Sequence, residues 1–279
     1  MRFPRFGLSP PLIASPRMNA FHEVAFGDDP GRWPLPAATS PLERWLRAVA
    51  AGGQGRYGSA LADLDVLDRA RLHGPLASLA ASTRASFLRQ LGGHHLARAW
   101  DGRAWALAGS DVAAGADALV GLAADALGVG RFALSHRLLC RARDVMSGAN
   151  EVASGRLSVR LAWVSAELAM FTGDAAGAVG HAEAAVELAS QGDSTRHGVK
   201  SQVVLAAALC SAGQVAASRR VAEAALETTE RLGLVPLSWA LACLLVDIGS
   251  TARTPSQVAA VRDRSADVVR HRGGRWTAR

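Results

Sequence analysis

A short segment that begins with glycine recurs five times in this 279-residue chain and sets a period for most of the sequence. The glycines lie 37, 38, 43 and 40 residues apart, and alanine or serine stands five residues after each of them. These glycines are Gly55, Gly92, Gly130, Gly173 and Gly213. One pair of helices fits within such a period, so the sequence predicts a stack of helix pairs.

Further small residues recur on both sides of each glycine. Seven residues before the glycines stand Ala48, Ala85, Ala123, Ala166 and Ala206. Twelve residues after them stand Leu67, Ala104, Ala142, Ala185 and Ala225. We expect each glycine to end the first helix of its pair in a left-handed conformation. The small residues are expected where the two antiparallel helices cross, because larger side chains would push the helices apart.

This pattern resembles the tetratricopeptide-repeat family over roughly residues 41–235. The family also has an aromatic residue two positions after the turn glycine. Here that position holds Tyr57, His94, Phe132, Ala175 and Val215. The chain departs from the family in lacking its helix-terminating proline and in having periods above about 34 residues. The resemblance implies an all-α fold, a right-handed superhelical solenoid of about five to six antiparallel helix pairs.

Three regions are expected along the chain. Residues 1–40 are rich in proline, glycine and aspartate and predict an extended or disordered arm, within which Met18 offers an alternative start of translation. Residues 41–249 form the helical repeat domain. Residues 250–279 form a capping helix and a basic tail, so that a degenerate sixth pair covers about 236–249 and 255–272.

Composition narrows the classes of function. Hydrophobic residues make up 49% of the chain and charged residues 20%, which excludes a disordered protein. The three cysteines lie far apart in apolar stretches, which argues against a disulfide framework and favours the cytoplasm. No run of 18 apolar residues exists. Most of the net charge of +7 comes from residues 251–279, where seven arginines face Asp263 and Asp267.

Candidate chemical sites are few. The adjacent side chains of His94 and His95 diverge on a helix and cannot share one metal ion. His136, Cys140 and Asp144 share a helix face, but no fourth ligand accompanies them. Sequence motifs for phosphate, dinucleotide or nucleophile sites are absent. We therefore expect no metal, no cofactor and no enzymatic activity.

A groove is the expected site of function, because in the resembled family the first helix of each pair lines the concave side. Counting back from each glycine predicts a groove that includes Trp45, Ser82, Ser86, Arg89, Trp163, Glu167, Met170 and Lys200. Tryptophan and arginine are common binding anchors. The alternative is that Trp45 and Trp163 are core residues between neighbouring pairs. No row of basic residues is evident, which favours an amphipathic helix or apolar peptide over an acidic tail.

The resulting hypothesis is a scaffold that binds a protein or peptide partner in this groove. The alternative is a regulatory module of a signalling or transcription system whose arginine-rich tail contacts nucleic acid. Self-association through the exposed ends of the solenoid is a further hypothesis. Residues 1–40 could also fold back into the groove through Phe21, Phe26 and Trp33.

Overall fold

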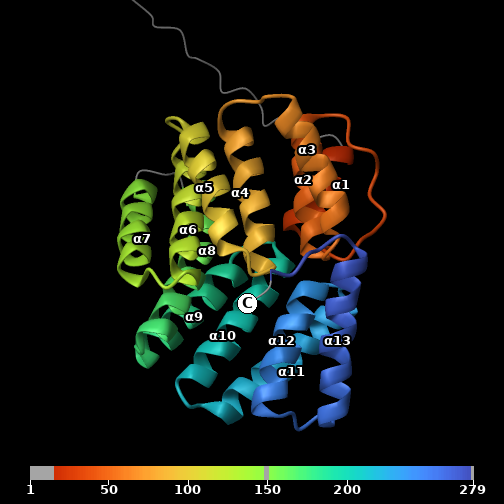
Figure 1. Cartoon of the computed structure of the whole chain (residues 1–279), viewed down its shortest axis with the longest axis vertical. Coiled ribbons are helices and arrows are strands. Elements are labelled where there is room, and N and C mark those ends of the chain that lie inside the picture. Colours follow the sequence, from red (N-terminus) through yellow and green to blue (C-terminus); the bar gives the residue numbers. More distant parts are fainter. Residues whose placement is uncertain (1–15, 148–150, 278–279) are drawn as a thin grey trace, which may run out of the picture.

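Helices account for all the regular secondary structure in residues 16–147 and 151–277, which are the residues that the computed structural model describes. Each helix packs against its neighbours in the chain (Figure 1). The helices are α1 (Pro16–Phe26), α2 (Pro41–Gly53), α3 (Tyr57–Arg69), α4 (Pro75–Gln90), α5 (His94–Ala108), α6 (Val112–Gly128), α7 (Phe132–Met146), α8 (Glu151–Thr172), α9 (Ala175–Ser190), α10 (Thr195–Ser211), α11 (Val215–Arg231), α12 (Val235–Ile248) and α13 (Pro255–His271). The all-α prediction is confirmed.

The glycine turns join consecutive helices as expected. For example, Gly130 joins α6 to α7 with φ +74°, and Gly213 joins α10 to α11 with φ +75°. This left-handed conformation costs a residue with a Cβ more than it costs glycine. Local signals fix the starts of other helices: Ser40 and Glu43 form a reciprocal capping box at α2, and Asp111 caps α6.

The recurrent small residues lie in the interior. All five alanines that stand seven residues before the glycines are 0% exposed, as are all five small residues that stand five residues after them. The hydroxyl of Ser218 donates to the carbonyl of Ala206, 2.7 Å away on the paired helix. Close approach of the two helices therefore depends on these small side chains, as the sequence predicts.

The N-terminal arm differs from the prediction, because residues 16–26 form helix α1 rather than extended chain. Phe21, Val24 and Ala25 are fully or almost fully buried in one apolar cluster with residues of α2. Their i, i+3, i+4 spacing gives α1 an apolar face, which the proline-rich and glycine-rich surroundings obscured. Residues 27–40 carry no helix, and residues 1–15 lie outside the described part.

The two ends of the helical array contact each other. The C-terminal end of α13 approaches the N-terminal helices end to end (Figure 1), and the amide of Gly58 in α3 donates to the carbonyl of Arg272 at 2.8 Å. The Thr277 amide donates to the carbonyl of Leu91 at 2.9 Å. The arm is also linked to α10, where the Thr195 amide donates to the carbonyl of Gly27 at 3.1 Å. The two ends on which the self-association hypothesis depends are therefore in contact with each other.

Candidate functional site

A cavity of ≈ 130 Å³ lies where the first helices of successive pairs converge. Side chains of α2, α4, α6, α8 and α10 line it, together with Phe26 of α1. Four residues of the predicted groove are among them: Trp45, Ser82, Ser86 and Trp163. The register of the turn glycines thus predicts residues from three different pairs that surround one space.

Both tryptophans are held by hydrogen bonds, and only part of each ring is exposed for binding a ligand. Trp45 is 7% exposed and belongs to an apolar core cluster, while its Nε1 donates to Thr83 Oγ1 at 2.9 Å. Trp163 is half-buried, and its Nε1 donates to Ser201 Oγ at 2.8 Å. Each indole thus reaches the first helix of the next pair. Trp45 is a core residue that touches the cavity, whereas Trp163 offers more of its ring.

Three arginines line this cavity, although counting back from the turn glycines shows no row of basic residues. Arg156 and Arg160 both form ion pairs with the buried Asp117. Burial favours the neutral form of Asp117, but the two arginines outweigh that effect and lower its pKa. Arg196 instead donates from Nη2 to the carbonyl of Ala25 at 3.1 Å.

A stack of rings lies beside two of these arginines, Arg156 and Arg196. His197 lies between Phe26, 6.0 Å away, and Trp163, 5.3 Å away, measured between ring centroids. Burial, and then the neighbouring guanidinium groups of Arg196 and Arg156, lower the pKa of His197 well below its usual value. The imidazole is therefore neutral near pH 7. Of the three arm residues that could fold back into the groove, Phe26 lines this cavity, whereas Phe21 is buried in the cluster with α2 and Trp33 packs against that cluster.

Arg89 does not reach this cavity. It lies between α4, α5 and α6, where it pairs with Asp101 and with Asp125, the latter at 2.9 Å. Ser82 also donates to Asp101, at 2.9 Å. Burial raises the pKa values of both aspartates, although Arg89 opposes the shift. The position predicted to bind a partner is thus occupied by a buried ionic cluster.

The other predicted groove residues lie beside the cavity rather than in its lining. Lys200 pairs with Glu167 at 3.7 Å, and its Nζ lies 5.8 Å from the centroid of the Trp163 ring. Met170 is half-buried against a neighbouring cluster of small residues. These side chains extend the surface around Trp163.

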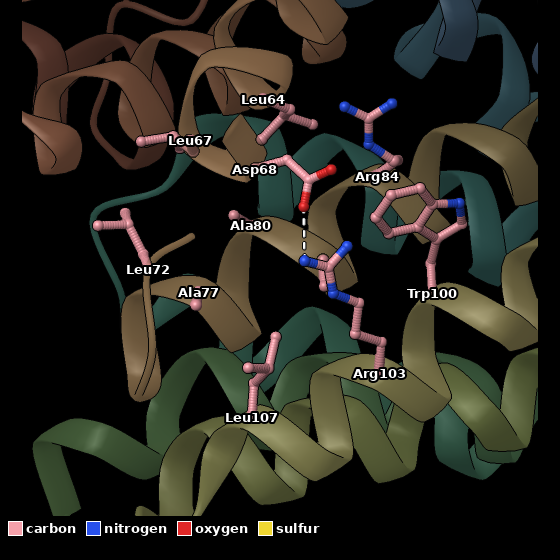
Figure 2. A pocket seen from close by; sticks show the side chains of 11 residues that line it. Leu64, Leu67, Asp68, Leu72, Ala77, Ala80, Arg84, Trp100, Arg103 and Leu107 are labelled. Atoms are coloured by element: carbon pink, nitrogen blue, oxygen red, sulfur yellow. Dashed lines mark ion pairs between the residues drawn. The ribbon is translucent and has the colours of Figure 1, made fainter. Parts of the chain in front are cut away.

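A second cavity, between α3, α4 and α5, is only ≈ 20 Å³ in volume. Figure 2 shows the ion pair of Asp68 with Arg103, 2.5 Å apart, crossing it. The guanidinium groups of Arg84 and Arg103 lie 4.7 and 5.4 Å from the centroid of the Trp100 ring. These contacts join the helices across a space too small for a ligand.

The arginine-rich tail is engaged within the protein. Four of its arginines pair with acidic residues: Arg253 and Arg264 with Glu230, Arg262 with Asp263, and Arg270 with Asp267. Arg272 donates to the carbonyl of Gln54 at 2.8 Å. Trp276, the one aromatic residue of the tail, contacts Trp239 with ring centroids 4.4 Å apart. These contacts leave fewer arginine and aromatic side chains free to bind nucleic acid. Arg279 lies outside the described residues.

Potential metal ligands are scattered over the described part of the chain. His136 and Cys140 lie within 4.0 Å of each other on the exposed side of α7, but no three potential metal ligands gather there or elsewhere in residues 16–147 and 151–277. Within the same residues, every helix is too short or too polar to cross a bilayer. Comparison of the chain with protein-family models and with curated proteins finds no match to either.

Proposed function

We propose that this protein is a binding scaffold of tetratricopeptide type, which recognises a segment of a partner protein without a cofactor. In this proposal the helix pairs form a right-handed superhelical stack of five to six repeats. The first helices line its concave side. The observation that carries the proposal is the convergence of Trp45, Ser82, Ser86 and Trp163 on one cavity, from helices far apart in the sequence.

The chemistry of the cavity favours binding over catalysis. Hydroxyl groups along it already donate to protein acceptors: Thr83 donates to the carbonyl of Leu79, and Ser86 to the carbonyl of Thr83. Asp117 is kept ionised by two arginines, and His197 is neutral between aromatic rings. Of the lining hydroxyls, Thr83 and Ser86 have backbone carbonyls as acceptors, and Ser82 donates to a carboxylate, Asp101, that is already paired with Arg89.

An affinity experiment with the full chain tests this proposal. A double variant, Trp163→Ala with Lys200→Ala, removes two partly exposed side chains of the predicted groove. The matched control is Arg220→Ala, because Arg220 lies exposed on α11, outside this cavity. Circular dichroism establishes that all three proteins are folded.

We expect a partner from the native cell extract to bind the wild type and the control and to be lost by the double variant. Equal recovery by all three proteins would contradict a binding role for the groove.

A further inference from the structure

The guanidinium of Arg196 has no carboxylate partner among the described residues. Its Nη2 is bonded to a backbone carbonyl, and its buried Nε has no hydrogen-bond partner. A charged group in a partly buried position is costly unless a counter-charge compensates it. Burial lowers the pKa of Arg196 to about 10, and the nearby Arg156 and Arg160 add to this effect. Arg196 therefore remains a cation at neutral pH while lacking a counterion.

The cavity as a whole also carries more positive than negative charge. Its charged lining residues are Arg156, Arg160 and Arg196 against the single carboxylate of Asp117, which leaves a net charge of +2. Low-polarity walls strengthen the attraction of an anion, because they reduce the screening by water. The cavity thus supplies two positive charges that the protein itself does not neutralise.

Aromatic rings line the same cavity as the arginines. Phe26, Trp45, Phe87 and Trp163 all contribute to the lining. Cavities of about 150 Å³ accept one benzene molecule, so a volume of ≈ 130 Å³ suits a body of about that size. The ligand should therefore combine one negative charge with a small apolar or aromatic group.

We propose that this cavity binds a carboxylate carried on a small aromatic or apolar body, with the Arg196 guanidinium as its principal cationic partner. A guanidinium matches the two oxygens of a carboxylate in geometry and forms short charge-assisted hydrogen bonds with them. The carboxylate can belong to a free organic acid or to the C-terminus of a peptide. This inference rests on the proposed function and deepens it, because the same cavity supplies the anchor for the partner.

The local backbone supports a specific placement of Arg196. A Cβ added to Gly53 would lie 2.8 Å from Arg196 Cδ, so the absence of a side chain at Gly53 lets the arginine pass close to α2. The centroid of the Phe26 ring lies 6.0 Å from the Arg196 guanidinium and 5.7 Å from that of Arg156. Arg196 is thus held at the meeting point of α1, α2 and α10.

Isothermal titration calorimetry of the full chain with benzoate tests the proposal, and benzamide serves as the uncharged probe of the same shape. We expect saturable binding of benzoate and at least tenfold weaker binding of benzamide. The variant Arg196→Gln should weaken benzoate by about 10–100-fold, since a hydrogen bond to a charged group contributes that much. Arg196→Lys should retain part of the affinity, because it keeps the charge and loses the planar fork.

The matched control is Arg220→Gln, which makes the same change of charge on the exposed face of α11. It should leave benzoate binding unchanged, and thermal melts should show that each variant is folded. Absence of benzoate binding to the wild type would overturn the proposal. Equal affinity for benzoate and benzamide, or equal loss in the Arg196→Gln and Arg220→Gln variants, would overturn it as well.

Two further arms separate the sources of the carboxylate. A short peptide that ends in phenylalanine is compared with its C-terminal amide, and both are compared with free benzoate. Preference for the free-acid peptide over benzoate assigns the cavity to a protein C-terminus, whereas the reverse assigns it to a small acid. If a partner binds the groove and no carboxylate does, the scaffold proposal stands and the carboxylate site fails. If a carboxylate binds and no partner does, the carboxylate site stands and the scaffold proposal fails.

Discussion

The buried cluster of Arg89, Asp101 and Asp125 makes the protein sensitive to the loss of one side chain. The Arg89 side chain is 10% exposed, and both carboxylates are 0% exposed. Replacing Arg89 by methionine leaves two buried acids without their cation, and breaking a buried pair in this way costs about 3–5 kcal/mol. For a chain of this length each kcal/mol lowers Tm by about 2 °C, which gives a decrease of roughly 6–10 °C near neutral pH.

The loss should depend on pH in a defined direction. Burial already raises the pKa values of Asp101 and Asp125, and removal of Arg89 raises them further. Over the range between the unfolded pKa of about 3.9 and the raised folded values, the folded state binds more protons than the unfolded state. The stability of Arg89→Met should therefore fall as pH rises from 5 to 8, and its deficit against the wild type should be smallest at pH 5.

Thermal and urea unfolding followed by circular dichroism at pH 5 and pH 8 measure both effects. The variant in which Arg89→Met is combined with Asp101→Asn and Asp125→Asn removes every charge of the cluster. It should regain most of the lost stability, because uncharged replacement of a buried ionic group is often close to neutral. A loss below about 1 kcal/mol, or one that does not change with pH, would show that Arg89 is solvated as a groove residue would be.

Four other substitutions test the backbone and the C-terminal end of the chain. Gly121→Ala should lower the free energy of unfolding in urea by about 1–3 kcal/mol, because its Cβ would lie 2.4 Å from a carboxylate oxygen of Asp101. Gly102 lies on an exposed part of its helix with open space around it, so Gly102→Ala should instead stabilise the protein by about 0.5–1 kcal/mol. Gly130→Ala should lower stability by about 1–2 kcal/mol through its φ of +74°, and an unchanged melting temperature would refute this. Trp276→Ala should cost at least about 0.5–1.5 kcal/mol, since it loses the ring contact that joins the C-terminus to α12, and a melt superimposable on that of the wild type would contradict that role.

Sequence periodicity predicted much of the fold because the features that control it are local. The turn glycines need a left-handed conformation, and the small residues need a helix crossing, so both leave regular marks in the sequence. Helices α12 and α13 pack against each other where the last pair was expected, with bounds within a residue or two of the prediction. His94, placed at the aromatic position, packs its ring against Gly128 of α6, where a Cβ would lie only 2.1 Å from His94 Nδ1.

The polar part of the site was less predictable, for two physical reasons. Register shows which face of a helix a residue occupies, but it does not show which charges that face will meet. Arg89 was correctly placed on the first helix of its pair, yet its partners, Asp101 and Asp125, come from the two following helices. The second reason is the length of the first helices, which extend further from the turn glycines than the 13 residues used to predict the groove.

Arg156 and Arg196 each stand 17 residues before a turn glycine, one helical turn beyond that range. Their equal register was the signal available in the sequence. The sequence could not show that Phe26 and Gly53 lie beside these arginines. These two residues belong to α1 and α2, which contact α10 only in the folded protein.

The two arginine-containing clusters differ in a way that bears on function. In the first, one guanidinium faces two carboxylates, and burial raises the pKa values of both acids, that of Asp125 to about 7. In the cavity, three guanidinium groups face one carboxylate, and no change in protonation near neutral pH removes the excess, because arginine stays charged. An interior that can neutralise its own charge needs no ligand to do so. An excess of fixed positive charge beside aromatic rings needs an anion from outside, and this asymmetry is why the cavity, rather than the Arg89 cluster, is the place to look for one.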